Sequence, residues 1–177
     1  MNNDKLEIFA YNKNYPKIFD KKKQELLKIL DGVEIHHIGS TAIPGMGGKG
    51  FIDILIGLDD WNQGEDIINK LKAHGFNHIH PKENERIFVS KEPGSMDYDT
   101  HLHIVLKNSK AYKEILFFRD FMKENPMEAK KYFELKLQLL KEAKANRKKY
   151  TQLKANYINR ICDIESGDVV YTVTPKC

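Results

Sequence analysis

The chain has 177 residues, of which 41% are hydrophobic and 31% charged, with a formal net charge of +4 at pH 7. This length is enough for one domain with a well-buried core. Its two cysteines, Cys162 and Cys177, are too few for a disulfide framework and lack metal-ligand spacing. No stretch has eighteen apolar residues and the N-terminus lacks a signal-peptide pattern, so we expect a cytoplasmic protein without a membrane segment.

Hydrophobic periodicity divides the first 107 residues into helices and short strands. The first helix is expected to carry Lys21, Lys22 and Lys23 on its solvated side, and a capping box of Asp60 and Gln63 opens the second. In chain order, we expect a helix over 16–30, strands over 33–38 and 51–56, a helix over 60–75, and strands over 76–80, 86–90 and 100–106.

The remainder of the chain is predicted to be helical. Ser109 or Asn108 is expected to cap one helix, Asn125 and Glu128 to form a capping box for the next, and Arg147 to begin a third. Their aromatic and aliphatic stripes indicate a buried core. We therefore expect one domain over 1–177, of α/β class, with an α/β core (1–107), a C-terminal helical part (108–165) and a tail (166–177) that could add an edge strand.

The positive charge is concentrated near the C-terminus. Residues 128–160 hold ten Lys or Arg and three Glu, a local charge of +7, so the rest of the chain sums to −3. The simplest interpretation is a solvated helical face, because the lysines alternate with apolar residues at helical spacing. The alternative is a surface that attracts triphosphates or nucleic acid.

The most informative stretch runs from His36 to Gly57, where a Gly-Ser turn and a glycine-dense loop precede an apolar strand. Asp53 lies inside that strand, and a buried carboxylate needs a cation or several hydrogen-bond donors. Gly39 and Ser40 end the preceding strand, where the N–H groups of a short helical turn and the serine hydroxyl suit phosphate. These features predict a site for a metal-bound nucleotide, unless Ser40 is only a cap and Asp53 only a structural carboxylate.

The glycine-dense loop at residues 45–50 satisfies G-x-G-x-x-G but leads into a strand, whereas the dinucleotide-binding fingerprint opens a helix. It also fails as a Walker A motif, since Gly50 stands where Ser or Thr should follow Lys49. The loop therefore either approaches a ligand closely or simply joins two strands. Lys49 either neutralises phosphate or Asp53, or is surface charge.

The strand over 100–106 carries His101 and His103 on the same face as Asp99. The His-x-His spacing lets two imidazoles reach one metal ion. If this strand lies beside the Asp53 strand, Asp53 with His103 and His101 forms a single-metal site, for which zinc or manganese suits imidazole better than magnesium. The alternative is that both histidines are packed or surface residues.

Five segments occur together between about Tyr15 and Ile161: HIGSTAIPG, KGFIDILI, THLHIV, FRDFM followed by NP, and a Tyr/Lys-rich helical end. In this combination the chain resembles the GrpB family, whose fold belongs to the DNA polymerase β-like nucleotidyltransferase superfamily. The resemblance implies a nucleotidyltransferase-like mixed β-sheet flanked by helices. It also makes His37 and Arg86 candidate cleft residues, of which the arginine could bind phosphate.

By the same resemblance, Gly39 and Ser40 match the phosphate-holding Gly-Ser of the superfamily, and Asp53 matches the first aspartate of an Asp-x-Asp pair. Leu55 stands where the second aspartate is expected, so one of two metal ions would lack a ligand. His103 comes near the position of the superfamily's third carboxylate.

Three functions follow as expectations. The first is transfer of a nucleotidyl group from an NTP to an unknown acceptor, with Mg, Mn or Zn at Asp53. The second is a non-catalytic nucleotide-binding or accessory module; GrpB-like segments occur joined to a dephospho-coenzyme A kinase, so such a kinase is an implied partner. The third is metal-dependent phosphohydrolase chemistry at the histidines. Nucleic acid is a further candidate partner because of the basic C-terminal helices.

Overall fold

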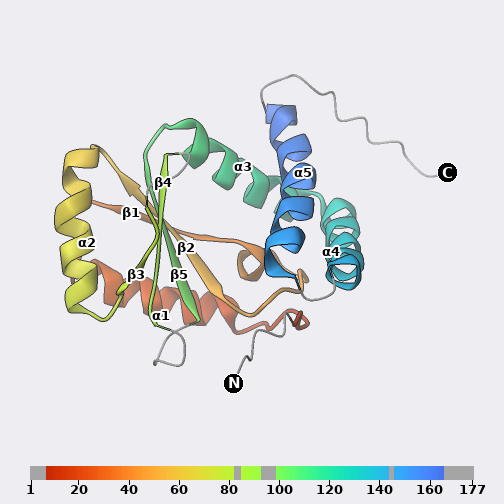
Figure 1. The fold of residues 1–177 in the computed structure, drawn as a ribbon, viewed down its shortest axis with the longest axis horizontal. Helices are drawn as coiled ribbons and strands as arrows, with labels where there is room; N and C mark the ends of the chain where they lie inside the picture. Colours follow the sequence, from red (N-terminus) through yellow and green to blue (C-terminus); the bar gives the residue numbers. More distant parts are fainter. Residues whose placement is uncertain (1–6, 82–84, 93–98, 144–145, 166–177) are drawn as a thin grey trace.

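The computed structural model describes residues 7–81, 85–92, 99–143 and 146–165, and the predicted tail over 166–177 lies outside them. Within these residues, five strands form one mixed sheet in the order β1-β2-β5-β4-β3 (Figure 1). β2 and β5 run parallel, and the other neighbouring strands are antiparallel. The strands are β1 (Glu34–Ile38), β2 (Ile52–Leu58), β3 (His78–Ile79), β4 (Arg86–Ser90) and β5 (Thr100–Leu106).

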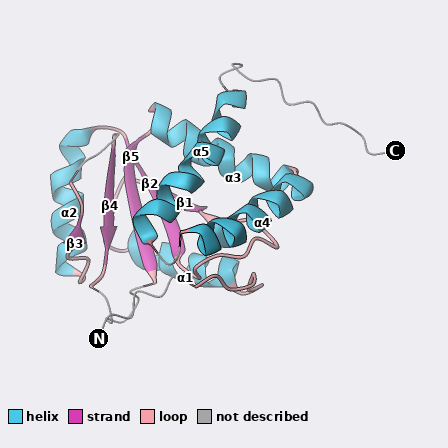
Figure 2. Ribbon diagram, turned by 45° about the vertical axis from the view of Figure 1, so that its right-hand side comes forward, coloured by secondary structure: helices cyan, strands magenta, loops and turns pink. Residues whose placement is uncertain are grey.

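Helices pack around this sheet, as Figure 2 shows. Together with the mixed sheet, they confirm the predicted α/β class with a C-terminal helical part. No described helix combines the length and the hydropathy that crossing a membrane requires. The helices are α1 (Tyr15–Leu27), α2 (Gly64–Ala73), α3 (Lys110–Glu124), α4 (Pro126–Glu142) and α5 (Arg147–Glu165), with short 3-10 turns η1 (Ser40–Ala42) and η2 (Trp61–Gln63).

One face of the sheet forms the main hydrophobic core with α1 and α2. Alternate residues of β2 point to this face, as the two-residue period of a strand requires. Leu26 of α1 and Leu71 of α2 pack against them. The most deeply buried strand residues of this core, each 1% exposed or less, are Ile52, Ile54, Ile56, Leu58, Val89, Leu102 and Ile104.

The opposite face is partly covered by α3. Leu55 of β2 is 0% exposed and forms a small apolar cluster with Ile38 and Val105, against which Ile115 and Leu116 of α3 pack. The position where a second aspartate was expected is therefore an interior contact between sheet and helix. A carboxylate there would be buried without a partner.

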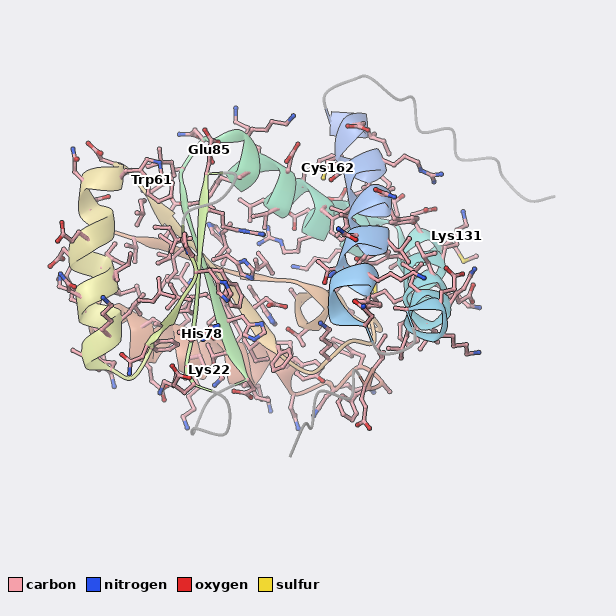
Figure 3. All side chains as sticks on the ribbon, in the orientation of Figure 1. Lys22, Trp61, His78, Glu85, Lys131 and Cys162 are labelled. Carbon is pink, nitrogen blue, oxygen red and sulfur yellow. The ribbon has the colours of Figure 1, made fainter. Side chains whose placement is uncertain are left out.

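α4 and α5 pack against α3 and against the Ile43–Met46 segment instead of directly on the sheet core. In Figure 3, Lys131 marks α4 and Cys162 marks α5 on one side of the molecule, whereas Trp61 and His78 lie on the other side.

Glu128, 3% exposed, joins the two helices: it accepts hydrogen bonds from Tyr157 Oη of α5 and, at 3.0 Å, from Lys131 Nζ. The predicted capping box with Asn125 is therefore wrong, because Glu128 turns inward. Asn125 makes no side-chain cap and donates to the Phe121 carbonyl oxygen.

Two other local predictions are confirmed. Asp60 and Gln63 form a reciprocal capping box at η2, and Ser109 Oγ caps α3 by accepting from the Tyr112 backbone N–H at 3.2 Å. These short-range signals succeed because both partners lie within one turn of each other.

The expectation that the lysines of α1 are solvated is wrong for Lys22. Its side chain is 9% exposed and its Nζ lies 3.2 Å from Asp99 Oδ1. α1 also ends at Leu27, short of the predicted residue 30, although Leu30 remains buried in the following turn. Asp99 is therefore tied to α1 and does not join His101 and His103 at the sheet face.

The segment before α1 crosses the glycine-dense loop. Phe9 and Gly48 form an antiparallel bridge with two backbone hydrogen bonds, of 2.7 and 3.0 Å. Ile8 packs against the small cluster of Leu139, Ala143 and Tyr150 at the junction of α4 and α5. The leading segment thus links the loop to the helical part.

Replacing Leu55 tests whether the position at which a second aspartate was expected is buried under α3. Leu55→Ala should cost about 2–5 kcal/mol of unfolding free energy, and Leu55→Asp should cost more because it buries an unpaired charge. Urea denaturation measures both, with Leu137→Ala on the 38% exposed side chain of α4 as a control expected to change little. A Leu55→Asp protein as stable as the wild type would contradict this arrangement.

Candidate functional site

Asp53 accepts hydrogen bonds from two histidines on the neighbouring strand. The parallel register sets Asp53 beside His101 and Leu55 beside His103, so all four side chains share one face. His101 Nδ1 lies 3.3 Å and His103 Nε2 3.5 Å from Asp53 Oδ1. The three side chains are 24%, 18% and 14% exposed for Asp53, His101 and His103, so the carboxylate is held by its own protein yet still reached by solvent.

Burial opposes ionisation of Asp53, but the hydrogen bonds from His101 and His103 outweigh it and hold the pKa of the carboxyl well below its ordinary value. The pKa of His103 is also lowered, because burial disfavours the imidazolium more strongly than Asp53 favours it. At neutral pH a neutral His103 therefore donates from Nε2 to an ionised Asp53. Its Nδ1 is buried, with no hydrogen-bond partner among the described residues.

Aromatic rings form one wall of this site. Phe51, just before β2, stacks on the His101 ring at 4.2 Å between centroids. Phe88 of β4 meets the rings of His101 and His103 edge-on, at 5.0 and 5.3 Å. These contacts fix the imidazole planes, so the hydrogen bonds to Asp53 are preorganised.

Gly39 brings the turn after β1 directly over Asp53. Its φ of +69° lies in the left-handed region that favours glycine. A Cβ atom at this position would come 2.3 Å from Asp53 Oδ2. The turn that follows, η1, has only three residues, so its dipole is small and positive charge at the site must come from side chains.

The glycine-dense loop packs against this turn and against α4. A Cβ atom on Gly48 would lie 2.3 Å from Ser40 Oγ and 4.0 Å from Lys136 Nζ, so both side chains face the loop. Lys136 Nζ donates a hydrogen bond to the Gly47 carbonyl oxygen. The absence of side chains on these glycines lets the loop, the serine and the lysine come together.

Lys136 is a buried cation. Its side chain is 4% exposed, and Nζ lies 5.3 Å from the Tyr132 ring centroid and 5.7 Å from that of Phe133. Burial lowers the pKa of Lys136 to about 7, the positive charges of Lys154 and Lys49 add to this effect, and Asp53 opposes it. The folded protein thus disfavours the charged form of this amine.

Two further lysines complete what we call the lysine cluster, namely Lys49, Lys136 and Lys154. Lys49 Nζ lies 5.5 Å and Lys154 Nζ 6.0 Å from the centroid of the same ring, that of Tyr150. The pKa of Lys154 is lowered by burial, while Asp53 raises it and Arg86 lowers it. Three segments distant in sequence, the glycine loop, α4 and α5, thus bring ammonium groups together, and the charge of Asp53 acts on those of α4 and α5.

The predicted site residues fall into two groups. Gly39, Asp53, His101 and His103 come together as expected, with Ser40 in the turn that follows Gly39. Lys49 lies instead over the Tyr150 ring of α5. Arg86 lies at the start of β4 on the same sheet face, paired in register with Val105, and its charge lowers the pKa values of His103 and Lys154.

His37 does not belong to the site. It pairs in register with Ile54 and therefore faces the α1 side of the sheet, where its ring stacks on Phe19 at 4.5 Å. Thr41 Oγ1 donates to the Phe51 carbonyl oxygen at 3.1 Å, so it must accept from His37 Nε2 at 3.0 Å. The prediction of a cleft residue is wrong, and His37 instead ties η1 to the loop before β2.

Lys136 and Lys154 were missed because they were assigned to a solvated helical face. A signal was nevertheless present: each follows a buried tyrosine by four residues, Tyr132 and Tyr150 respectively, and so lies on the apolar stripe of its helix. A lysine on the buried stripe, unlike one on the opposite side, must have a reason to be there.

The predicted metal centre does not fit this donor set well. Asp53 Oδ1 already accepts from both histidines, and Leu55 supplies no ligand. Among the residues that the structure describes, no group of three or more His, Cys, Asp or Glu side chains is arranged to hold a metal ion. Asp53 interacts electrostatically with the ammonium groups of Lys136 and Lys154, and ammonium groups repel a divalent cation.

Two surface hollows lie elsewhere. One lies beside α2 and β4 and is lined by Trp61, Ile68 and Ile87. The other follows the outer side of α3, at Tyr112 and Phe117. Neither of these hollows is lined by Asp53.

Comparison with known proteins identifies the class to which this arrangement belongs. The sequence model of the GrpB protein family matches residues 5–163, and the chain therefore belongs to the GrpB family. The crystal structure of conserved protein GrpB from Enterococcus faecalis is similar, with a TM-score of 0.79 and 25% identity, covering 92% of this chain and 98% of that one.

Two curated relatives agree with this assignment. UPF0157 protein YqkA of Bacillus subtilis is 34% identical over 159 residues, which are 87% of this chain but only 45% of that protein. Glutamate-rich protein GrpB of Alkalihalophilus pseudofirmus is 29% identical over 168 residues, covering 91% of this chain and 96% of the relative. The chain thus spans less than half of the first relative and nearly all of the second.

Gly39→Ala tests the contact between the turn and Asp53. Gly45 has a φ of +76°, and a Cβ atom added there would have no other atom within 4 Å, so Gly45→Ala is a matched control that carries only the backbone strain. We expect about 1 kcal/mol of destabilisation for the control and roughly 2 kcal/mol more for Gly39→Ala, measured by urea denaturation. Adding Asp53→Ala should recover part of the difference, and equal losses at the two glycines would refute the contact.

The stability of the protein should depend on pH through His37. Burial, followed by the charge of Lys123, lowers the pKa of His37 to about 4. Between pH 6.5, the ordinary pKa of histidine, and a pH of about 4, the unfolded state therefore binds more protons than the folded state. The free energy of unfolding falls as the pH falls through this range. In His37→Gln, urea denaturation should show a free energy of unfolding that falls less steeply with decreasing pH, the slope being smaller by up to ~1.4 kcal/mol per pH unit. His74→Gln, at an exposed position, should keep the wild-type slope.

Proposed function

We propose that the protein binds the phosphate chain of a nucleotide, or a related polyphosphate, at the lysine cluster beside Asp53. The observation that carries this proposal is the position of Lys136: a cation 4% exposed, held among aromatic rings and beside two other ammonium groups. Burying a cation costs free energy unless a partner compensates. Lys136 donates to the neutral Gly47 carbonyl oxygen, and among the described residues neither Lys136 nor Lys154 forms an ion pair with a carboxylate.

An anion would relieve this unfavourable arrangement. The lowered pKa values of Lys136 and Lys154 mean that the folded protein disfavours their charged forms in the absence of a ligand. A phosphate group next to the ammonium groups favours the charged forms and gains charge-assisted hydrogen bonds. The Ser40 hydroxyl faces the same glycine loop as Lys136 and provides a further donor for the same ligand.

Binding is better supported than nucleotidyl transfer. The transfer that the GrpB resemblance implies depends on paired carboxylates that hold two ions, and here the second position is the buried Leu55. A non-catalytic nucleotide-binding module, alone or next to a kinase partner, uses the lysine cluster and needs no second carboxylate. An accessory role of this kind agrees with the donor set around Asp53.

Ligand-dependent stability tests the proposal. ATP, AMP, pyrophosphate and adenosine are compared by thermal shift and titration calorimetry, and stabilisation should increase with the number of phosphates. A ligand at one hundred times its dissociation constant adds ~2.7 kcal/mol to the stability. Lys154→Met should weaken the binding of ATP by about tenfold, or ~1.4 kcal/mol.

The matched control is Lys141→Met, which removes a lysine on the exposed side of α4 and should leave affinity unchanged. Adenosine stabilising the protein as strongly as ATP would refute phosphate recognition. An equal loss of affinity in Lys141→Met and Lys154→Met would show a diffuse attraction to the basic helices instead of a site.

A further inference from the structure

The charge that neutralises the ligand comes from the protein's own amines. Lys136 and Lys154 lie close enough to Asp53 to feel its charge, and Lys49 and Lys154 share the Tyr150 ring. The single carboxylate is already engaged by His101 and His103. A magnesium ion bound to phosphates usually takes one or two carboxylate ligands from the protein as well, and here the second position is Leu55, which lies under α3 at 0% exposure. The site thus has positive charge in place of metal ligands.

Asp53 serves a different purpose in this arrangement. Its ionised carboxylate raises the pKa values of Lys136 and Lys154, opposing the effect of their burial. Its two hydrogen bonds fix it at the sheet face, from which it helps keep the amines charged. A carboxylate that holds lysines protonated prepares a site for an anion, whereas a carboxylate that binds a metal ion prepares one for a metal complex.

We infer that the site takes its polyphosphate ligand in the metal-free form, with Lys49, Lys136 and Lys154 supplying the charge that divalent ions supply in two-metal nucleotidyltransferases. This inference rests on the proposed function and specifies its ligand class as free nucleoside triphosphate or pyrophosphate. The inference predicts in which direction magnesium changes the affinity for the ligand. Mg²⁺ bound to the phosphates reduces the negative charge that the amines attract and brings a cation toward them, so Mg²⁺ weakens binding.

The test compares the affinities of the wild-type protein for pyrophosphate and for ATP in EDTA and in saturating Mg²⁺, at equal ionic strength, by titration calorimetry. We expect about tenfold weaker binding with Mg²⁺, which is ~1.4 kcal/mol. Lys136→Met should lose affinity in EDTA and show a smaller effect of Mg²⁺, and Lys141→Met should behave as the wild type. Because the main comparison uses the wild-type protein, it does not depend on whether a variant folds.

The outcomes separate the inference from the proposed function. Affinity that rises with Mg²⁺, or that disappears in EDTA, would overturn the inference while leaving phosphate binding in place. The absence of binding under both conditions would overturn both. Asp53→Asn gives a second readout, the pH dependence of metal-free binding. Without the neighbouring negative charge Lys136 and Lys154 lose their protons at lower pH, so the affinity should begin to fall at a lower pH than in the wild type, and an unchanged pH profile would argue against the role assigned to Asp53.

Discussion

The structure depends on the pairing of Asp53 with His101 and His103 across two parallel strands. A charged oxygen in an otherwise apolar strand would be costly, and two imidazole donors on the next strand remove most of that cost. The pairing works only in this register, since a shift by one residue would turn both histidines toward the core on the α1 side. The same hydrogen bonds thus fix the strand register and place an ionised carboxylate at the sheet surface.

The lysine cluster adds the opposite charge from the helical part of the chain. Lys136 and Lys154 extend from α4 and α5, which are joined by the hydrogen bond between Glu128 and Tyr157, so the two amines approach the sheet as one unit. The burial of Lys136 lowers the stability that the apolar helices would otherwise have, and such costs are typical of functional sites. The arrangement explains why an apolar stripe in these helices includes cations.

Most of the fold could be predicted from the sequence, because its signals are local. The alternation in β5 and the capping box at Asp60 each act over a few residues and appear in the structure as expected. The site residues on the strands could be predicted, because the alternation of polar and apolar residues shows which face of the sheet His101 and Asp53 lie on. The assignments that failed depend on partners distant in sequence: His37 packs on Phe19, and Lys22 pairs with Asp99.

The two site lysines show the same limit. Lys136 belongs to the Asp53 site only because α4 folds back over the loop around Gly47, and no periodicity in α4 specifies that contact. The sequence contained a weaker clue in the spacing from Tyr132, which shows that the lysine is on the inner side of the helix but not what it meets there. Leu55 illustrates the reverse case: a departure from a family motif was visible in the sequence, while its cause, the packing of α3, was not.

The bridge between Phe9 and Gly48 has a thermodynamic consequence. The backbone hydrogen bonds of this bridge belong both to the segment that precedes α1 and to the loop that meets Lys136. If the loop binds phosphate as proposed, a ligand that orders the loop also favours the bridged position of the leading segment, and by reciprocity an ordered segment increases the affinity for that ligand. The proposed binding site and the start of the described chain would then be linked equilibria, although more than forty residues separate Phe9 from Asp53.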